Sequence, residues 1–188
     1  MMDDATRRRP AGLQVAPAER APVAWATSWF FFLMTGYYML RPLRDTAATL
    51  FDVQKHELRW AFFGTFIGIL IWLSVYAALA SLMSRQRLVA SVHHFAALVQ
   101  LLFWWTYRDF GSRPVVYLTL FYIWISVLGL FCVAVVWSAL ADLFTKEQSE
   151  RLFGPIAVGA TVGGLVGSAA MPHLVEWVGL RHSLLLPL

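Results

Sequence analysis

The sequence predicts an all-α integral membrane protein with five transmembrane helices and the start of a sixth. Of its 188 residues, 59% are hydrophobic and only 14% are charged, against about 25% charged in a soluble domain. The mean hydropathy is +0.62. The apolar residues form blocks long enough to cross a bilayer, and tryptophan and tyrosine lie near the ends of several blocks, as they do at the headgroup level.

The elements are expected in the following order. Residues 1–21 are polar and rich in Pro and Ala, which predicts a disordered cytoplasmic tail. We expect spans at 22–43, 60–83, 88–107, 114–144 and 152–175, with an incipient sixth over 180–188. Pro22 suits a helix start. The third span is the weakest because it contains His93, His94 and Gln100. The fourth is longer than a bilayer needs, which indicates that it tilts or projects beyond the bilayer core.

The connection between the fourth and fifth spans carries its own signals. Thr145 and Gln148 form the T-x-x-Q pattern of a capping box, which predicts that a short helix starts there. Glu147 and Arg151 are four residues apart and can pair on its surface. The apolar end of the chain after Gly179 looks like the first turns of a sixth span, so we expect this chain to be part of a longer protein.

Two spans carry glycines at helix-packing spacing. Gly159, Gly163 and Gly167 lie on one face of the fifth span, and Gly64 and Gly68 repeat the spacing in the second. Small residues allow the backbone of another helix to come close, which is how helices associate in lipid. We expect contacts between helices of this chain, with a dimer seam as the other interpretation.

The composition argues against several functional classes. The net charge is +4 and no basic stripe is present, so we expect no nucleic-acid partner. His93 and His94 are adjacent and would point about 100° apart on a helix, so we expect no metal site. There is no nucleophile–base pair and no phosphate-binding loop, so we expect neither an enzyme nor a cofactor. Cys132 is the only cysteine, which excludes an intrachain disulfide.

The end of the first span, GYYMLRPLRDT, is the candidate functional segment. On a helix Met34, Tyr37, Arg41 and Arg44 share a face, with Asp45 beside it, and Arg41 and Asp45 can neutralise one another. These charges have two interpretations. They can be flanking charges that extend to the headgroups. They can instead form a cationic site at the mouth of a polar cavity, where guanidinium groups bind phosphate or carboxylate.

Three segments carry a resemblance to a known family: YYMLRPLRDT, YAALASLMSRQRLV and FYIWISVLGLFCVAVVWSALADLFTKEQSERLFGPIAVGATVGGLVGS. Together they resemble the bacterial branch of the nucleotide (ATP/ADP) translocase family, which is related to the major facilitator fold. The resemblance covers residues 25–168. It implies a twelve-helix transporter of two six-helix halves, with the substrate site between them and this chain as most of the N-terminal half.

The resemblance also implies roles for individual residues. In the family the first span ends in Leu-Arg-x-x-Lys-Asp, and its lysine is associated with nucleotide transport. Leu40, Arg41 and Asp45 match this pattern, and Arg44 stands in place of the lysine. Ser126 stands where the family has a glutamate. The resemblance therefore implies transport of an anionic metabolite, with a nucleotide as the substrate it names. On this hypothesis we expect Arg41 and Arg44 to bind the anion, Asp45 to orient or pair with them, and Tyr37 and Tyr38 to line the entry.

The expected setting follows from this interpretation. We expect a multi-pass protein of the bacterial inner membrane with a cytoplasmic N-terminus, although Lys and Arg are divided almost evenly between the two sides. The expected partners are the lipid bilayer, an anionic small molecule and a C-terminal transporter half or a larger membrane complex. The alternative is a non-transporting accessory or scaffold subunit that docks through the glycine face of the fifth span.

Overall fold

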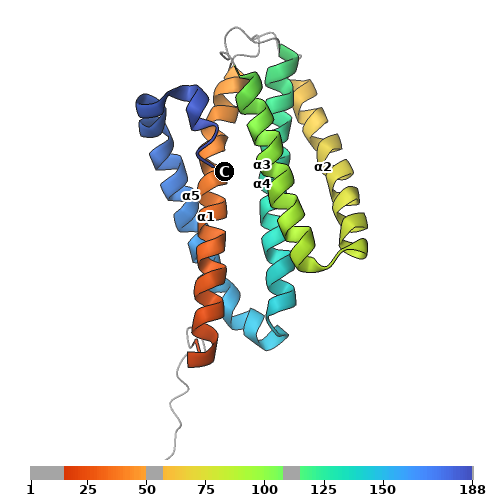
Figure 1. Cartoon of the computed structure of the whole chain (residues 1–188), viewed down its shortest axis with the longest axis vertical. Coiled ribbons are helices and arrows are strands. Elements are labelled where there is room, and N and C mark those ends of the chain that lie inside the picture. Colours follow the sequence, from red (N-terminus) through yellow and green to blue (C-terminus); the bar gives the residue numbers. More distant parts are fainter. Residues whose placement is uncertain (1–14, 50–56, 108–114, 188) are drawn as a thin grey trace, which may run out of the picture.

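The computed structural model describes residues 15–49, 57–107 and 115–187, and all regular structure in these ranges is helical. A short 3₁₀ helix, η1 (Pro17–Glu19), is followed by five long helices. These are α1 (Arg20–Thr49), α2 (Glu57–Leu82), α3 (Arg85–Thr106), α4 (Val115–Leu143) and α5 (Lys146–Ser183). Successive helices run up and down the bundle (Figure 1).

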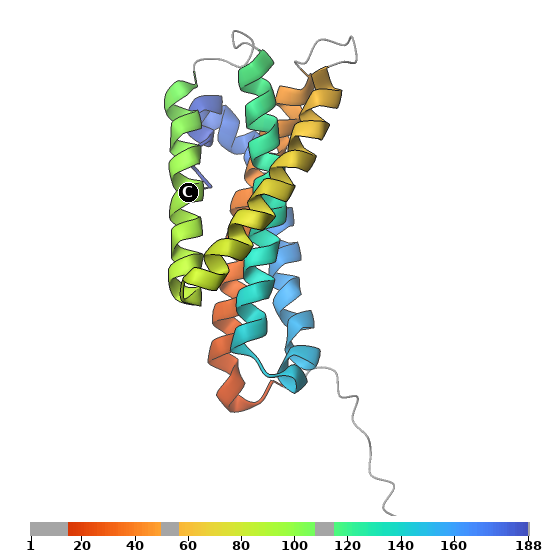
Figure 2. The same cartoon turned by 90° about the vertical axis from the view of Figure 1, so that its right-hand side faces the viewer.

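Four of the helices form a row in the order α5, α1, α4, α2, and α3 stands to one side of it (Figures 1 and 2). Helix α4 is the core of the bundle: Phe121, Ile125, Val136 and Leu140 have no exposed surface. Helix α2 is its opposite, because no residue of its apolar window is buried. An apolar helix with an apolar outer surface is typical of a protein whose solvent is lipid.

In the described part of the chain, four helices are long and apolar enough to cross a membrane: α2, α3, α4 and α5. They indicate a membrane protein, as the composition predicts. The expected count of five spans and a sixth is not reproduced, because α1, which covers the predicted span 22–43, is not among the four. Its Trp, Tyr, Thr and Ser residues lower its mean hydropathy.

The two ends of the chain differ from the expectation. Residues 17–19 of the predicted disordered tail form η1, and α1 already begins at Arg20; residues 1–14 lie outside the described ranges. At the other end, helix α5 bends at Gly179, whose φ of +78° is tolerated by glycine, and continues to Ser183. Residues 184–187 then turn into the bundle near α1 and α3 instead of starting a separate helix (Figure 1).

The capping box of α5 is present. The amide N–H of Gln148 donates to Oγ1 of Thr145 at 3.4 Å, and the amide of Thr145 donates to the side chain of Gln148 at 3.0 Å. The prediction of a separate short helix is wrong, because α5 runs without interruption from this cap through the whole predicted fifth span. Leu152 and Ile156, four residues apart, are both buried and attach this first part to the bundle.

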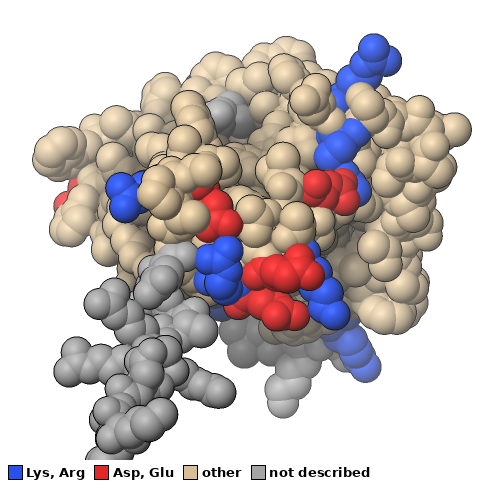
Figure 3. Space-filling model, turned by 90° about the horizontal axis from the view of Figure 1, so that it is seen from below, with Lys and Arg blue, Asp and Glu red and all other residues tan. Residues whose placement is uncertain are grey.

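Charged residues gather at the end of the bundle where α1 begins and α4 ends (Figure 3). Arg151 binds Oε1 of Glu19 at 2.9 Å, and the side chain of Gln148 donates to the same oxygen at 3.0 Å. Arg151 was expected to pair with Glu147, and the structure gives it a partner in η1, Glu19. The Ala16 amide and, after it, Gln148 and Arg151 lower the pKa of Glu19. These contacts join the beginning of α1 to the beginning of α5.

Glycines make the closest helix contacts. A Cβ atom added at Gly159 would lie 2.6 Å from the carbonyl oxygen of Thr27, and at Gly163 and Gly167 it would lie closer still to the backbone of α1, one and two turns further on. Gly64 and Gly68 of α2 face Ile123 and Val127 of α4. The glycine face of α5 is therefore covered by α1 and is not open to another protein.

Candidate functional site

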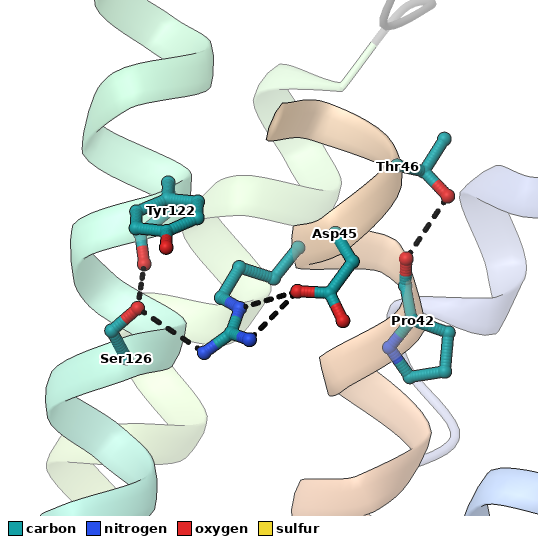
Figure 4. Close-up of polar contacts among 6 residues, drawn as sticks. Pro42, Asp45, Thr46, Tyr122 and Ser126 are labelled. Carbon is teal, nitrogen blue, oxygen red and sulfur yellow. Dashed lines mark hydrogen bonds and ion pairs between the residues drawn. The ribbon is translucent and has the colours of Figure 1, made fainter. Parts of the chain in front are cut away.

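The candidate segment lies in the last turns of α1 and not beyond its end. The predicted span stops at residue 43, but the helix continues to Thr49 in spite of Pro42. Pro42 has no amide hydrogen, and its own carbonyl accepts a hydrogen bond from the hydroxyl of Thr46 at 2.9 Å (Figure 4). Arg41, Arg44 and Asp45 are therefore held in fixed directions by a helix.

Arg44 of α1 contacts Ser126 of α4, and Figure 4 shows Ser126 and Tyr122 on the side of α4 that faces Asp45. Nε and Nη2 of Arg44 donate to Oδ1 of Asp45 at 2.9 and 2.7 Å, and its Nη1 donates to Oγ of Ser126 at 3.5 Å. The guanidinium lies 5.3 Å from the centre of the Tyr122 ring. Only 17% of the side chain is exposed, so this cation is held by a carboxylate, a hydroxyl and an aromatic face within the bundle.

Arg41 lies on the neighbouring side of α1 and is exposed. Its guanidinium lies 5.5 Å from the centre of the Tyr38 ring. Together with Asp45 and with Ser168 of α5, it lines an open hollow of about 560 Å³. The expected pairing of Arg41 with Asp45 is replaced by the pair between Asp45 and Arg44.

The two tyrosines point toward different helices. Tyr37 packs on Gly129 of α4, where there is no side chain to displace its ring, and Tyr38 packs on Gly164 of α5. Their rings meet edge to face with the centres 5.2 Å apart. The structure therefore divides the five predicted residues: Tyr37 and Arg44 face α4, and Tyr38 and Arg41 face α5, with Asp45 between the two arginines.

Two residues near the segment were not predicted from the sequence to take part in such contacts. Tyr122 lies in an apolar run, where an aromatic residue gives no sign that a cation will lie against it. Gln100 was recorded only as a weakness of the third span. It is 2% exposed, donates to the carbonyl of Leu184 at 3.0 Å and accepts from the indole of Trp124 at 3.2 Å. A lone amide within an apolar span is a signal for such an internal contact.

Comparisons with known protein families, with curated proteins and with solved structures find no match for this chain. The resemblance to the translocase family therefore stays a prediction from the sequence. In the described part of the chain, no three His, Cys, Asp or Glu side chains lie close enough together to hold a metal ion.

Proposed function

We propose that this chain is the helical bundle of a secondary transporter of the major facilitator type and that it carries an anionic metabolite. The observation that supports it is the environment of Arg44. A guanidinium has five N–H donors, and Asp45 and Ser126 engage three of them. The remaining donors suit a phosphate or carboxylate group, for which the planar guanidinium is the preferred partner.

The relation between Arg44 and Ser126 adds to this proposal. They are 82 positions apart in the chain, yet a hydrogen bond of 3.5 Å joins them. They are also the two positions at which the sequence departs from the translocase pattern, Arg for Lys and Ser for Glu. Because Ser126 carries no charge, it does not neutralise the positive charge of Arg44 as a glutamate would, and that charge can attract an anionic ligand. This favours an anion over a neutral or cationic substrate.

The hollow beside Arg41 provides a place for the rest of the metabolite. Its volume of about 560 Å³ falls in the range of about 300–1,000 Å³ that is typical of small-molecule sites. Asp45 lines this hollow together with Arg41 and is paired with Arg44. An incoming anion would compete with this carboxylate for Arg44, so binding of the substrate and release of Asp45 would be coupled.

The proposal includes the finer architecture. In it, α1 counts as a span because it crosses the bundle beside α5, and the segment after Gly179 begins a sixth. The chain then supplies the N-terminal half of a facilitator in the bacterial inner membrane, with its N-terminus in the cytoplasm and a C-terminal half as its partner. A nucleotide is the first substrate to test.

Arg44→Gln tests the proposal, with Arg20→Gln at the opposite end of the same helix as the matched control. The protein is purified in lipid nanodiscs and its thermal unfolding is measured with nucleotides, inorganic phosphate and dicarboxylates. We expect one of these anions to stabilise the wild type and Arg20→Gln. The same anion should bind Arg44→Gln about 10- to 100-fold more weakly, because that variant loses one charged hydrogen-bonding partner of the anion. Equal binding by Arg44→Gln refutes the role of Arg44, and no binding of any anion refutes the substrate class.

An accessory or scaffold subunit is the alternative function. The glycine face cannot serve as its docking surface, because α1 occupies it. The observation that favours this alternative is the outer surface of α2, where Trp60, Phe62 and Phe66 are more than half exposed. A complex of fixed stoichiometry isolated from native membranes, and lost when these residues are replaced by leucine, would support it over transport.

A further inference from the structure

An open hollow of about 620 Å³, here called the outer hollow, lies between α1, α3 and α4, apart from the proposed anion site. It extends to the end of the bundle where α3 begins and α4 ends (Figure 1). Arg85, the first residue of α3, and Asp142, near the end of α4, line it there. Its other walls are largely apolar, with Trp29, Val89 and Leu143 among them. The outer hollow therefore joins a charged pair to an apolar groove.

The charged pair keeps hydrogen-bonding capacity on both partners. Nε of Arg85 binds Oδ2 of Asp142. Nη1 of Arg85 donates to the hydroxyls of Ser138 and, at 3.4 Å, of Tyr76. Nη2 of Arg85 and Oδ1 of Asp142 have no partner among the described residues, and the two side chains are 35% and 49% exposed. Two N–H donors and one carboxylate oxygen are thus available at the mouth of the groove.

The groove is long enough for an acyl chain. His93 lines both the outer hollow and an interior hollow of about 120 Å³, which also lies between α1, α3 and α4, so the two adjoin. Together they follow α3 from Arg85 to Gln100, fifteen positions further on, which is about 22 Å of helix. One leaflet is half of a bilayer core, about 15 Å. An acyl chain whose headgroup lies at Arg85 can therefore follow the groove through the depth of its leaflet.

We propose that the outer hollow binds a phospholipid whose headgroup carries a primary ammonium, phosphatidylethanolamine. Its phosphate accepts hydrogen bonds from Nη2 of Arg85, and its ammonium donates to Oδ1 of Asp142. The phosphate and the ammonium are neighbours in one headgroup, as the guanidinium and the carboxylate are in the pair. The acyl chain covers the apolar walls. The site does not depend on the transport of an anion.

The charged pair distinguishes between headgroups. Phosphatidylglycerol offers a phosphate to Arg85 but has no cation for Asp142. Phosphatidylcholine carries a cation, but its trimethylammonium has no N–H with which to donate a hydrogen bond. A free phosphate ion would leave the apolar walls uncovered. The combination of a cation, an anion and an apolar groove therefore favours the ethanolamine headgroup over the other two.

The experiment uses the chain in lipid nanodiscs that contain equal parts of phosphatidylethanolamine, phosphatidylcholine and phosphatidylglycerol with the same acyl chains. The protein is released into detergent, and native mass spectrometry identifies the lipids that stay bound. We expect the wild type to retain phosphatidylethanolamine about tenfold over phosphatidylcholine, because one hydrogen bond between charged groups separates them. Retention of the three lipids in equal amounts overturns the proposal, and this measurement requires no variant to fold.

Two pairs of variants test the headgroup contacts. Asp142→Asn should lose the preference for ethanolamine over choline, whereas Glu150→Gln, an exposed carboxylate at the same end of the bundle, should keep it. Arg85→Gln should retain less of all three lipids than Arg87→Gln, whose side chain is exposed and is not among those that line the outer hollow. An Asp142→Asn protein with the wild-type preference would contradict the ammonium contact and with it the proposed lipid class.

A third pair tests the groove itself. Ala90 lines the outer hollow and is exposed, so Ala90→Trp fills the groove without replacing either charged residue. Ser91 is also exposed but is not among the lining residues, so Ser91→Trp is the control. We expect Ala90→Trp to retain about tenfold less phosphatidylethanolamine than Ser91→Trp. Equal retention by these two variants would place the acyl chain elsewhere and refute the site.

Discussion

The contact between α1 and α5 can be tested by adding a single methyl group. In Gly159→Ala the new Cβ atom would lie 2.6 Å from the carbonyl oxygen of Thr27 and 2.7 Å from its methyl carbon. Ordinary non-bonded contacts begin near 3.5 Å, so the two helices would have to separate by about 0.9 Å. The obstacle includes backbone, which cannot turn away as a flexible side chain can.

Two opposing effects determine how much Gly159→Ala lowers the free energy of unfolding. Overpacking a close contact costs about 1–3 kcal/mol. Alanine in place of glycine within a helix returns about 0.5–1 kcal/mol. We therefore expect Gly159→Ala to lower the free energy of unfolding by about 1–2 kcal/mol. The control is Gly154→Ala in the same helix, where no atom lies within 4 Å of the added Cβ, and where only the favourable effect remains.

The assay is reversible unfolding in mixed micelles, followed by the circular dichroism of the helices in both variants and in the wild type. A Gly159→Ala protein that is as stable as Gly154→Ala would refute the close backbone contact. The same result at Gly163 would extend the refutation to the whole seam, since its neighbour there is the backbone of Phe31.

Two further changes test contacts at opposite ends of the bundle. The pKa of Glu19 is lowered in the folded protein, so the stability from its contact with Arg151 is present at neutral pH and is lost as the pH falls through that lowered pKa. In thermal unfolding, Glu19→Gln should be less stable than the wild type at neutral pH and equally stable in acid. A difference in stability that persists in acid would contradict this. Gln100→Leu should lower the stability by about 1–3 kcal/mol, because it leaves the Leu184 carbonyl and the Trp124 indole without their partner. Hydrogen exchange at residues 184–187 should accelerate, and unchanged exchange would contradict the contact.

The hydropathy pattern predicted most of the helices because both lipid and the interior of the bundle favour apolar side chains. Helices α2 and α4 are apolar over most of their length and were located to within a few residues. Helix α1 shows the limit of this signal. Its Trp, Tyr, Thr and Ser residues keep its mean hydropathy below that of the other four long helices, although it packs against α5 and α4. The glycine spacing of α5 was visible in the sequence, but the partner helix was not.

The location of the candidate site could be predicted from the sequence, but the contacts of its side chains could not. GYYMLRPLRDT identified the charged end of α1, because charges after a long apolar run stand out. The sequence could not show that Arg44 would reach Ser126 and Tyr122, since these contacts depend on how α1 and α4 pack. The sequence indicated only that His93 and His94 would point in different directions, and the packing of the helices shows that His93 lines the interior hollow while His94 is exposed.

The position of α1 has a consequence for how the protein is made. This helix is synthesised before the other four long helices, yet its mean hydropathy is below theirs. The surface that fits it most closely is the glycine face of α5, the last of these five helices to be synthesised. A nascent chain that ends before Lys146 would present α1 without this cover. We therefore expect α1 to reach its final position only after α5 has been synthesised.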